Sequence, residues 1–143
     1  TALLRGFDYK VDKVYKTNNP PVELQVKWYQ YDLGFFHNFY CKSYNVENAE
    51  VGNIYGQFLY KNDIVMLPLR KLAEELGEEV CWNNERQQAY ITQNGQNIYV
   101  NGTLYDTKTY VNPIEFEKLG YNVTFGKNDE LRENYINITK EMQ

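Results

Sequence analysis

The chain has 143 residues, a formal net charge of −4 and an unusually aromatic composition of 14 Tyr, 7 Phe and 2 Trp. The aromatic content excludes a disordered chain, and the negative charge argues against a nucleic-acid partner, because phosphate binding needs clustered Lys and Arg. No apolar run reaches the ~18 residues of a membrane span, so we expect no membrane insertion and a single domain over residues 1–143. The chain begins at Thr1 without a signal peptide, and we expect a processed or trimmed form.

The first part of the chain, residues 1–50, is interpreted as an aromatic β extension. Alternation of apolar and polar residues predicts an edge strand in 7–15 and a half-buried strand in 22–31. A further aromatic segment spans 35–44. A hairpin is expected over 54–66, because two strand-like runs there flank a polar turn.

Residues 65–82, VMLPLRKLAEELGEEVCW, have the clearest pattern. Pro68 suits the first turn of a helix, where its missing N–H has no partner, and Gly77 suits a left-handed helix end. Val80 and Trp82 then alternate with a polar position, which predicts a strand returning along the helix. The apolar residues at helical spacing are Leu69, Leu72, Ala73 and Leu76. We expect Leu72 and Leu76 to be buried together with Val80 and Trp82.

A second, weaker copy of this unit occupies residues 109–125, with Phe125 in the place of Trp82. Its helix has Asn112 as N-cap, Pro113 at the first position and Glu115 where a capping box needs an acid. Two such units predict an α+β fold. In that fold an antiparallel β-sheet packs against two short helices as two β-α-β units, with the aromatic N-terminal β extension added.

The first copy also carries a family resemblance. The Pro68-Leu69-Arg70 start, the helix ending at Leu76-Gly77 and the Val80–Trp82 strand resemble the bacterial copper amine oxidase N-terminal domain-like, or stalk domain, family. The resemblance covers residues 52–138 and defines a stalk-like region over 52–139. Asn83 departs from it, since the family usually has Asp there, and the second copy lacks the P-L-R start.

The resemblance implies a non-catalytic binding or stalk module of a bacterial extracellular or cell-surface protein. Such a module would mediate attachment to a protein or to a cell-surface ligand. It would need no cofactor of its own.

No catalytic or metal-binding pattern stands out in the sequence. His37 is the only histidine, and one His with two distant Cys is too few for a copper or zinc site. Ser43, the only serine, lacks a nucleophile-elbow context. Tyr135 follows Asn134 but precedes Ile136, whereas the cofactor-forming Tyr of copper amine oxidases precedes an acid. We therefore expect no enzyme activity, no cofactor and no bound metal.

The two cysteines leave two alternatives open. Cys41 and Cys81 are either free thiols or a disulfide that ties the extension to the first repeat unit, as would suit an extracellular protein. They lack the C-x-x-C spacing of a redox or metal site.

The candidate binding surface is the aromatic extension, because exposed aromatic patches are typical of interaction sites. A carbohydrate-binding aromatic platform is a variant of this hypothesis. Three alternatives stay open: the aromatics form a second core layer, they form the interface of an obligate homo-oligomer, or with the histidine they build the site of a small enzyme or small-ligand binder. The residues proposed for this surface are Tyr29, Tyr31, Phe35, Phe36, His37 and Tyr40.

Overall fold

The computed structural model describes residues 20–30, 36–61 and 64–141. The strand expected in 7–15 lies outside these residues. The described elements are, in chain order, β1 (Glu23–Tyr29), β2 (Phe36–Tyr44), β3 (Glu50–Lys61), β4 (Ile64–Pro68), α2 (Leu69–Glu75), β5 (Val80–Asn83), β6 (Gln88–Gln93), β7 (Gln96–Tyr99), β8 (Gly102–Tyr105), β9 (Lys108–Val111), the 3-10 helix η1 (Pro113–Leu119), β10 (Tyr121–Asn128) and β11 (Glu133–Lys140).

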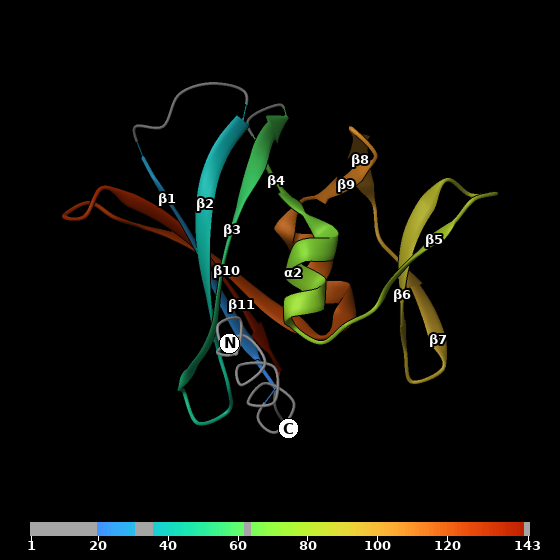
Figure 1. Cartoon of the computed structure of the whole chain (residues 1–143), viewed down its shortest axis with the longest axis horizontal. Coiled ribbons are helices and arrows are strands. Elements are labelled where there is room, and N and C mark those ends of the chain that lie inside the picture. Colours follow the sequence, from blue (N-terminus) through green and yellow to red (C-terminus); the bar gives the residue numbers. More distant parts are fainter. Residues whose placement is uncertain (1–19, 31–35, 62–63, 142–143) are drawn as a thin grey trace, which may run out of the picture.

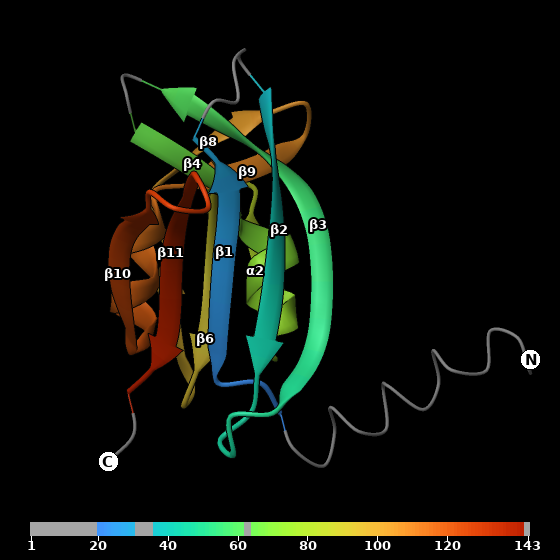
Figure 2. The ribbon, with the colours of Figure 1, turned by 90° about the vertical axis from the view of Figure 1, so that its left-hand side faces the viewer.

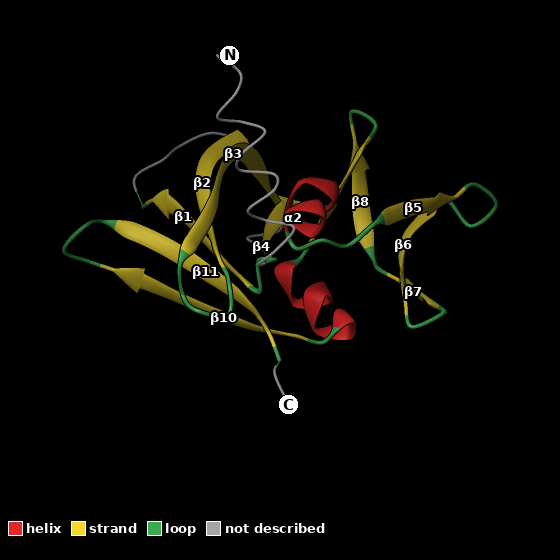
Figure 3. Cartoon of the chain, turned by 60° about the horizontal axis from the view of Figure 1, so that its bottom comes forward, coloured by secondary structure: helices red, strands yellow, loops and turns green. Residues whose placement is uncertain are grey.

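The strands form two antiparallel sheets. The large sheet has eight strands in the order β10-β11-β1-β2-β3-β4-β9-β8, and the small sheet has the order β5-β6-β7. Figure 1 shows α2 and η1 between the strands of the large sheet and the small sheet. Figure 3, seen from another side, shows the same arrangement, with the two helices in the middle of the molecule.

The expected α+β fold with two β-α-β units is wrong. Strands account for 61% of the structure and helices for 12%, so the protein is essentially all-β. The strands on either side of α2 belong to different sheets, and β9 and β10, on either side of η1, lie near opposite edges of the large sheet. The reason lies in the chain termini: Val26 on β1 pairs with Ile136 on β11, so the N-terminal extension and the C-terminal strands complete one sheet.

The first helix begins and ends where the sequence predicts. Pro68 closes β4 and occupies the N-cap of α2, and Gly77 just beyond the helix takes a left-handed φ of 84°. A non-glycine residue would be strained at that φ. The chain therefore turns sharply after α2 and starts β5 three residues later.

The second helix is confirmed in position but differs in kind. The side chain of Asn112 accepts a hydrogen bond from the backbone N–H of Ile114 at 3.1 Å, which is the predicted N-cap, and Gly120 ends η1 with φ 90°. The expected capping box is wrong, because the carboxylate of Glu115 instead accepts from the backbone N–H of Asn101 at 2.8 Å. This bond fastens η1 to the chain segment that precedes β8.

The core lies between the large sheet, the helices and the small sheet. Leu72, Leu76 and Val80 are buried there as predicted. Trp82 is not, since 39% of it is exposed. It shares the strand face of Val80, because alternate residues of a strand point to the same side. A helix of seven residues is only about 10 Å long, and it leaves the far end of β5 uncovered.

Candidate functional site

The structure separates the residues predicted for the aromatic surface. Tyr31 and Phe35 lie outside the described residues, and Phe36 is placed only as the first backbone position of β2. His37 is 4% exposed; its ring stacks on Phe58 with the centroids 5.1 Å apart. His37 therefore packs in the core on the helix side of the sheet, and it is not part of an accessible surface.

Tyr29 and Tyr40 lie on the opposite, outer face of the large sheet. Figure 2 views this face, with the helices behind β10, β11, β1, β2 and β3. Tyr29 is 49% exposed, and Tyr55, which pairs with Tyr40 across β2 and β3, is 67% exposed. Tyr40 itself is half-buried and donates its hydroxyl hydrogen to the buried carboxylate of Glu133.

The environment of Tyr40 makes it a fixed proton donor. Burial raises the pKa of Tyr40 above its ordinary value, and the hydrogen bond to Glu133 raises the pKa further because it favours the neutral phenol. The outer-face tyrosines thus combine one anchored ring with two exposed rings. Their role in binding stays a prediction.

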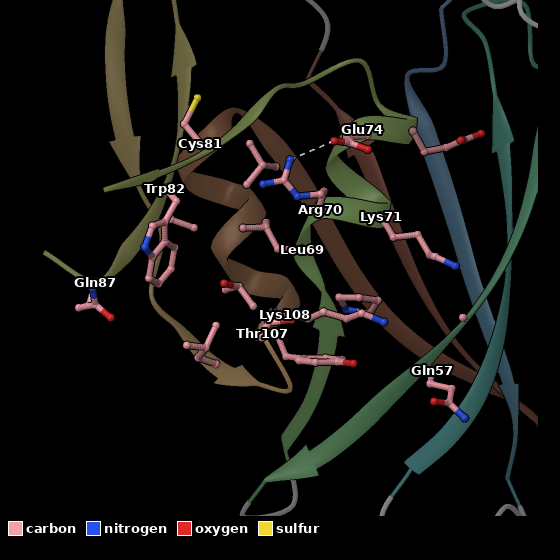
Figure 4. A pocket seen from close by; sticks show the side chains of 18 residues that line it. Gln57, Leu69, Arg70, Lys71, Glu74, Cys81, Trp82, Gln87, Thr107 and Lys108 are labelled. Carbon is pink, nitrogen blue, oxygen red and sulfur yellow. Dashed lines mark hydrogen bonds and ion pairs between the residues drawn. The ribbon is translucent and has the colours of Figure 1, made fainter. Parts of the chain in front are cut away.

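A concavity of the described residues lies elsewhere, between α2, β5 and the β8–β9 hairpin. It is an open groove of about 1080 Å³. Figure 4 shows Trp82 on one side of the groove, Lys71 and Gln57 on the other, and Leu69, Arg70 and Lys108 between them. A ligand in the groove would therefore touch residues of both sheets.

Apolar contact in the groove centres on Trp82. Trp82 is exposed, whereas Val80, two residues before it on β5, is buried. Leu104 of β8 adds a second exposed apolar side chain to the lining. Leu69 is buried beneath, where it belongs to the core. An exposed indole on a strand is held by the paired backbone of β5 and β6, so it loses less conformational freedom on binding than a side chain on a loop would.

The charges around the groove are unevenly neutralised. Arg70 pairs with Glu74 one helical turn away at 3.2 Å. Lys71 donates to the backbone carbonyl of Tyr55 at 2.6 Å. Within the described part of the chain, neither Lys71 nor Lys108 forms a salt bridge with a carboxylate. The groove therefore carries two cations that no carboxylate of the described residues neutralises.

Glu75 also lines the groove, and its carboxylate is hydrogen-bonded to a buried residue of the large sheet. It accepts a hydrogen bond from the hydroxyl of Ser43 at 2.8 Å. Because Ser43 is buried on β2, this contact joins α2 to the large sheet. The acids of the groove are thus engaged in contacts within the protein.

The cysteines are both free thiols in the structure. Cys41 is fully buried in the large sheet, and burial raises its pKa to about 12. Cys81 is half-buried in β5 at the groove. Across residues 20–30, 36–61 and 64–141, no three His, Cys, Asp or Glu side chains lie close enough to hold a metal ion, and no helix is long and apolar enough to cross a membrane.

Sequence reasoning missed this groove for two reasons. Trp82 was assigned to the core from strand alternation alone. Lys108 and Leu104 reach the groove only because β9 pairs with β4, with Val111 opposite Leu67, and so brings the β8–β9 hairpin beside α2. The available signal was local: Arg70 and Lys71 are adjacent cations at the start of a short helix.

Comparison with known proteins places these observations in a family. No curated protein and no solved structure matches the chain. The family model described as the copper amine oxidase N-terminal domain matches residues 45–118, more than half of the chain. This domain is the non-catalytic N-terminal part of copper amine oxidases. The match includes every element that borders the groove, and the chain belongs to the copper amine oxidase N-terminal domain family.

Proposed function

We propose that this chain is a non-catalytic binding module of a bacterial extracellular or cell-surface protein, and that the groove is its binding site. One observation carries the proposal: an exposed indole, Trp82, stands in a groove whose lining residues all fall within the family-matched segment 45–118. The extracellular and bacterial setting is inferred from the family resemblance.

The groove has the properties expected of a binding site. Its volume of about 1080 Å³ lies just above the ~300–1,000 Å³ range of small-ligand pockets, and Trp is enriched among residues that dominate binding energy. Its two carboxylates, Glu74 and Glu75, contact Arg70 and Ser43 within the protein. Attachment rather than chemistry is what the site supports.

The test is a comparison of binding to arrays of oligosaccharides and peptides. Trp82→Ala removes the exposed ring, and Phe125→Ala is the matched control because Phe125 is its exposed counterpart in the second unit and does not line the groove. We expect the parent and Phe125→Ala to give the same signals and Trp82→Ala to lose them. A parent without any signal, or a Trp82→Ala variant with the parent's signals, would refute the proposal.

A second candidate function is self-association through the outer face of the sheet. Tyr29 and Tyr55 are exposed there, and in the view of Figure 2 both helices lie behind the outer strands. Tyrosine is common at interfaces because one end of the ring is apolar and the other accepts water. The oligomeric state of variants at these two positions decides this alternative.

A further inference from the structure

We propose that the groove binds an acidic polysaccharide, with Trp82 stacking on a sugar ring and Lys71 and Lys108 binding sugar carboxylates. The inference rests on the proposed function, because it names the ligand class of the same site. It is carried by the joint presence, around one groove, of a flat aromatic surface and two cations that form no salt bridge within residues 20–30, 36–61 and 64–141.

The indole side of the groove suits a sugar ring. A pyranose presents a face of C–H groups that packs on an aromatic plane, while its hydroxyls point sideways to polar partners. Trp82 offers such a plane, and Gln87 lies beside it. The side-chain nitrogen of Gln87 already donates to Asn84, so Gln87 would offer a ligand its carbonyl oxygen as an acceptor. A ligand without a flat apolar face would leave the indole exposed to water.

The lysines of the groove suit a carboxylate. Lys71 and Lys108 both belong to the lining and both are exposed. An ammonium group has three donors, and Lys71 uses one of them on the carbonyl of Tyr55, which leaves two for a ligand. Hydrogen bonds between an ammonium and a carboxylate are stronger than those between neutral groups. Arg70 contributes less, because Glu74 already neutralises it.

The size of the groove favours a chain over a single sugar. Figure 4 shows Leu69 and Arg70 between Trp82 and Lys71, so the aromatic contact and the contact with Lys71 fall on different parts of the lining. The volume of about 1080 Å³ accommodates several units. An acidic peptide fits less well, because recognition of an extended peptide uses a row of pockets for alternate side chains, and the apolar contacts here centre on one ring.

Three probes of equal length separate the contributions of ring and charge. Hexamers of galacturonic or mannuronic acid carry both, the methyl-esterified hexamers carry the ring without charge, and hexaglutamate carries the charge without the ring. By titration calorimetry with the full chain at low salt, we expect a uronate hexamer to bind at least about tenfold more tightly than either partial probe. Raising the salt concentration should weaken that binding, because exposed charges are screened.

Each other outcome refutes the proposal in a distinct way. Equal binding of the ester shows that the ligand is a neutral sugar, and tighter binding of hexaglutamate shows that it is an acidic peptide. Failure of every probe, together with a Trp82-dependent signal on the arrays, rejects the ligand class while the proposed function stands. Absence of any Trp82-dependent signal rejects both.

Variants test which residues stack on the sugar ring and which bind its carboxylates. Trp82→Ala should weaken uronate binding at least about tenfold, and the double variant Lys71→Gln with Lys108→Gln should reduce it to the level of the ester. Lys140→Gln is the matched control, since Lys140 is an exposed lysine on β11 outside the groove. Thermal midpoints equal to that of the parent exclude unfolding. Unchanged binding by the double variant would overturn the proposal.

Discussion

The phenol of Tyr40 on β2 donates a hydrogen bond to the buried carboxylate of Glu133 on β11, across the intervening strand β1. The two residues are 93 positions apart in the chain. The contact therefore joins the N-terminal strands to the C-terminal hairpin and helps to hold the large sheet in register.

This contact predicts a characteristic loss of stability at alkaline pH. The pKa of Tyr40 is raised in the folded state, so the contribution of Tyr40 is complete below the unfolded value of 10.0 and is lost as the pH rises above it. Tyr121, whose pKa is raised by burial and by its hydrogen bond to Glu78, acts in the same direction. The free energy of unfolding can be measured at each pH from 7 to 11 by urea unfolding, followed by circular dichroism.

Tyr40→Phe isolates the effect. At pH 7 the variant should lose about 1–3 kcal/mol of unfolding free energy, because the buried carboxylate of Glu133 is left without this donor. Above pH 10 its stability should fall less steeply than that of the parent. Identical pH slopes for the two proteins would show that the phenol does not titrate as described.

The packing of α2 is tested by shortening one buried leucine. Leu76 is buried at the end of α2, and Leu76→Ala should cost roughly 2–5 kcal/mol of unfolding free energy through lost burial and a cavity. Leu131→Ala, at an exposed turn position, should stay within about 0.5 kcal/mol of the parent. The measurement is the urea midpoint, and equal midpoints for both variants would contradict the observed core.

The ends of the helices could be predicted from the sequence, whereas the pairing of the strands could not. Local signals were sufficient for the helices: Pro68 and Asn112 mark the starts, and Gly77 and Gly120 mark the ends. Alternation likewise located β1. Such signals act over a few residues, so they carry no information on which strands pair.

The fold class and the groove depend on pairings between distant segments. The pairing of β1 with β11 makes the protein essentially all-β, and the pairing of β4 with β9 assembles the groove. Trp82 illustrates the limit, since strand alternation predicts it in the core beside Val80, whereas 39% of it is exposed. His37 was placed on a surface although its ring stacks inside on Phe58.

The two thiols should differ strongly in reactivity. Cys41 is buried and its pKa is raised to about 12, so almost no thiolate forms at pH 8. Cys81 is half-buried and should react. Alkylation with iodoacetamide at pH 8, followed by peptide mass spectrometry, should modify Cys81 alone in the folded protein and both residues in urea. Modification of neither thiol in the unreduced, urea-denatured chain would indicate a disulfide instead.

The outer tyrosines can be changed without disturbing the core. Because Tyr29 and Tyr55 are largely exposed, replacing each with Ser should change the unfolding free energy by only about 0.5 kcal/mol. Sedimentation velocity then shows whether the double variant loses any self-association of the parent. A large loss of stability with association unchanged would place these rings in the core and remove the outer face as an interface.

The pairing of β1 with β11 has a mechanical consequence. Glu23 lies opposite Thr139, and the backbone N–H of Lys140 donates to the carbonyl of Val22 at 2.7 Å, so β1 begins beside the end of β11. Tension applied between Val22 and Lys140 would break the hydrogen bonds between these two strands one at a time. These two positions are separated by only about 5 Å, the spacing of neighbouring strands. Under such tension the folded part between them, with the groove, would lie to one side of the line of force and would not act as a spacer.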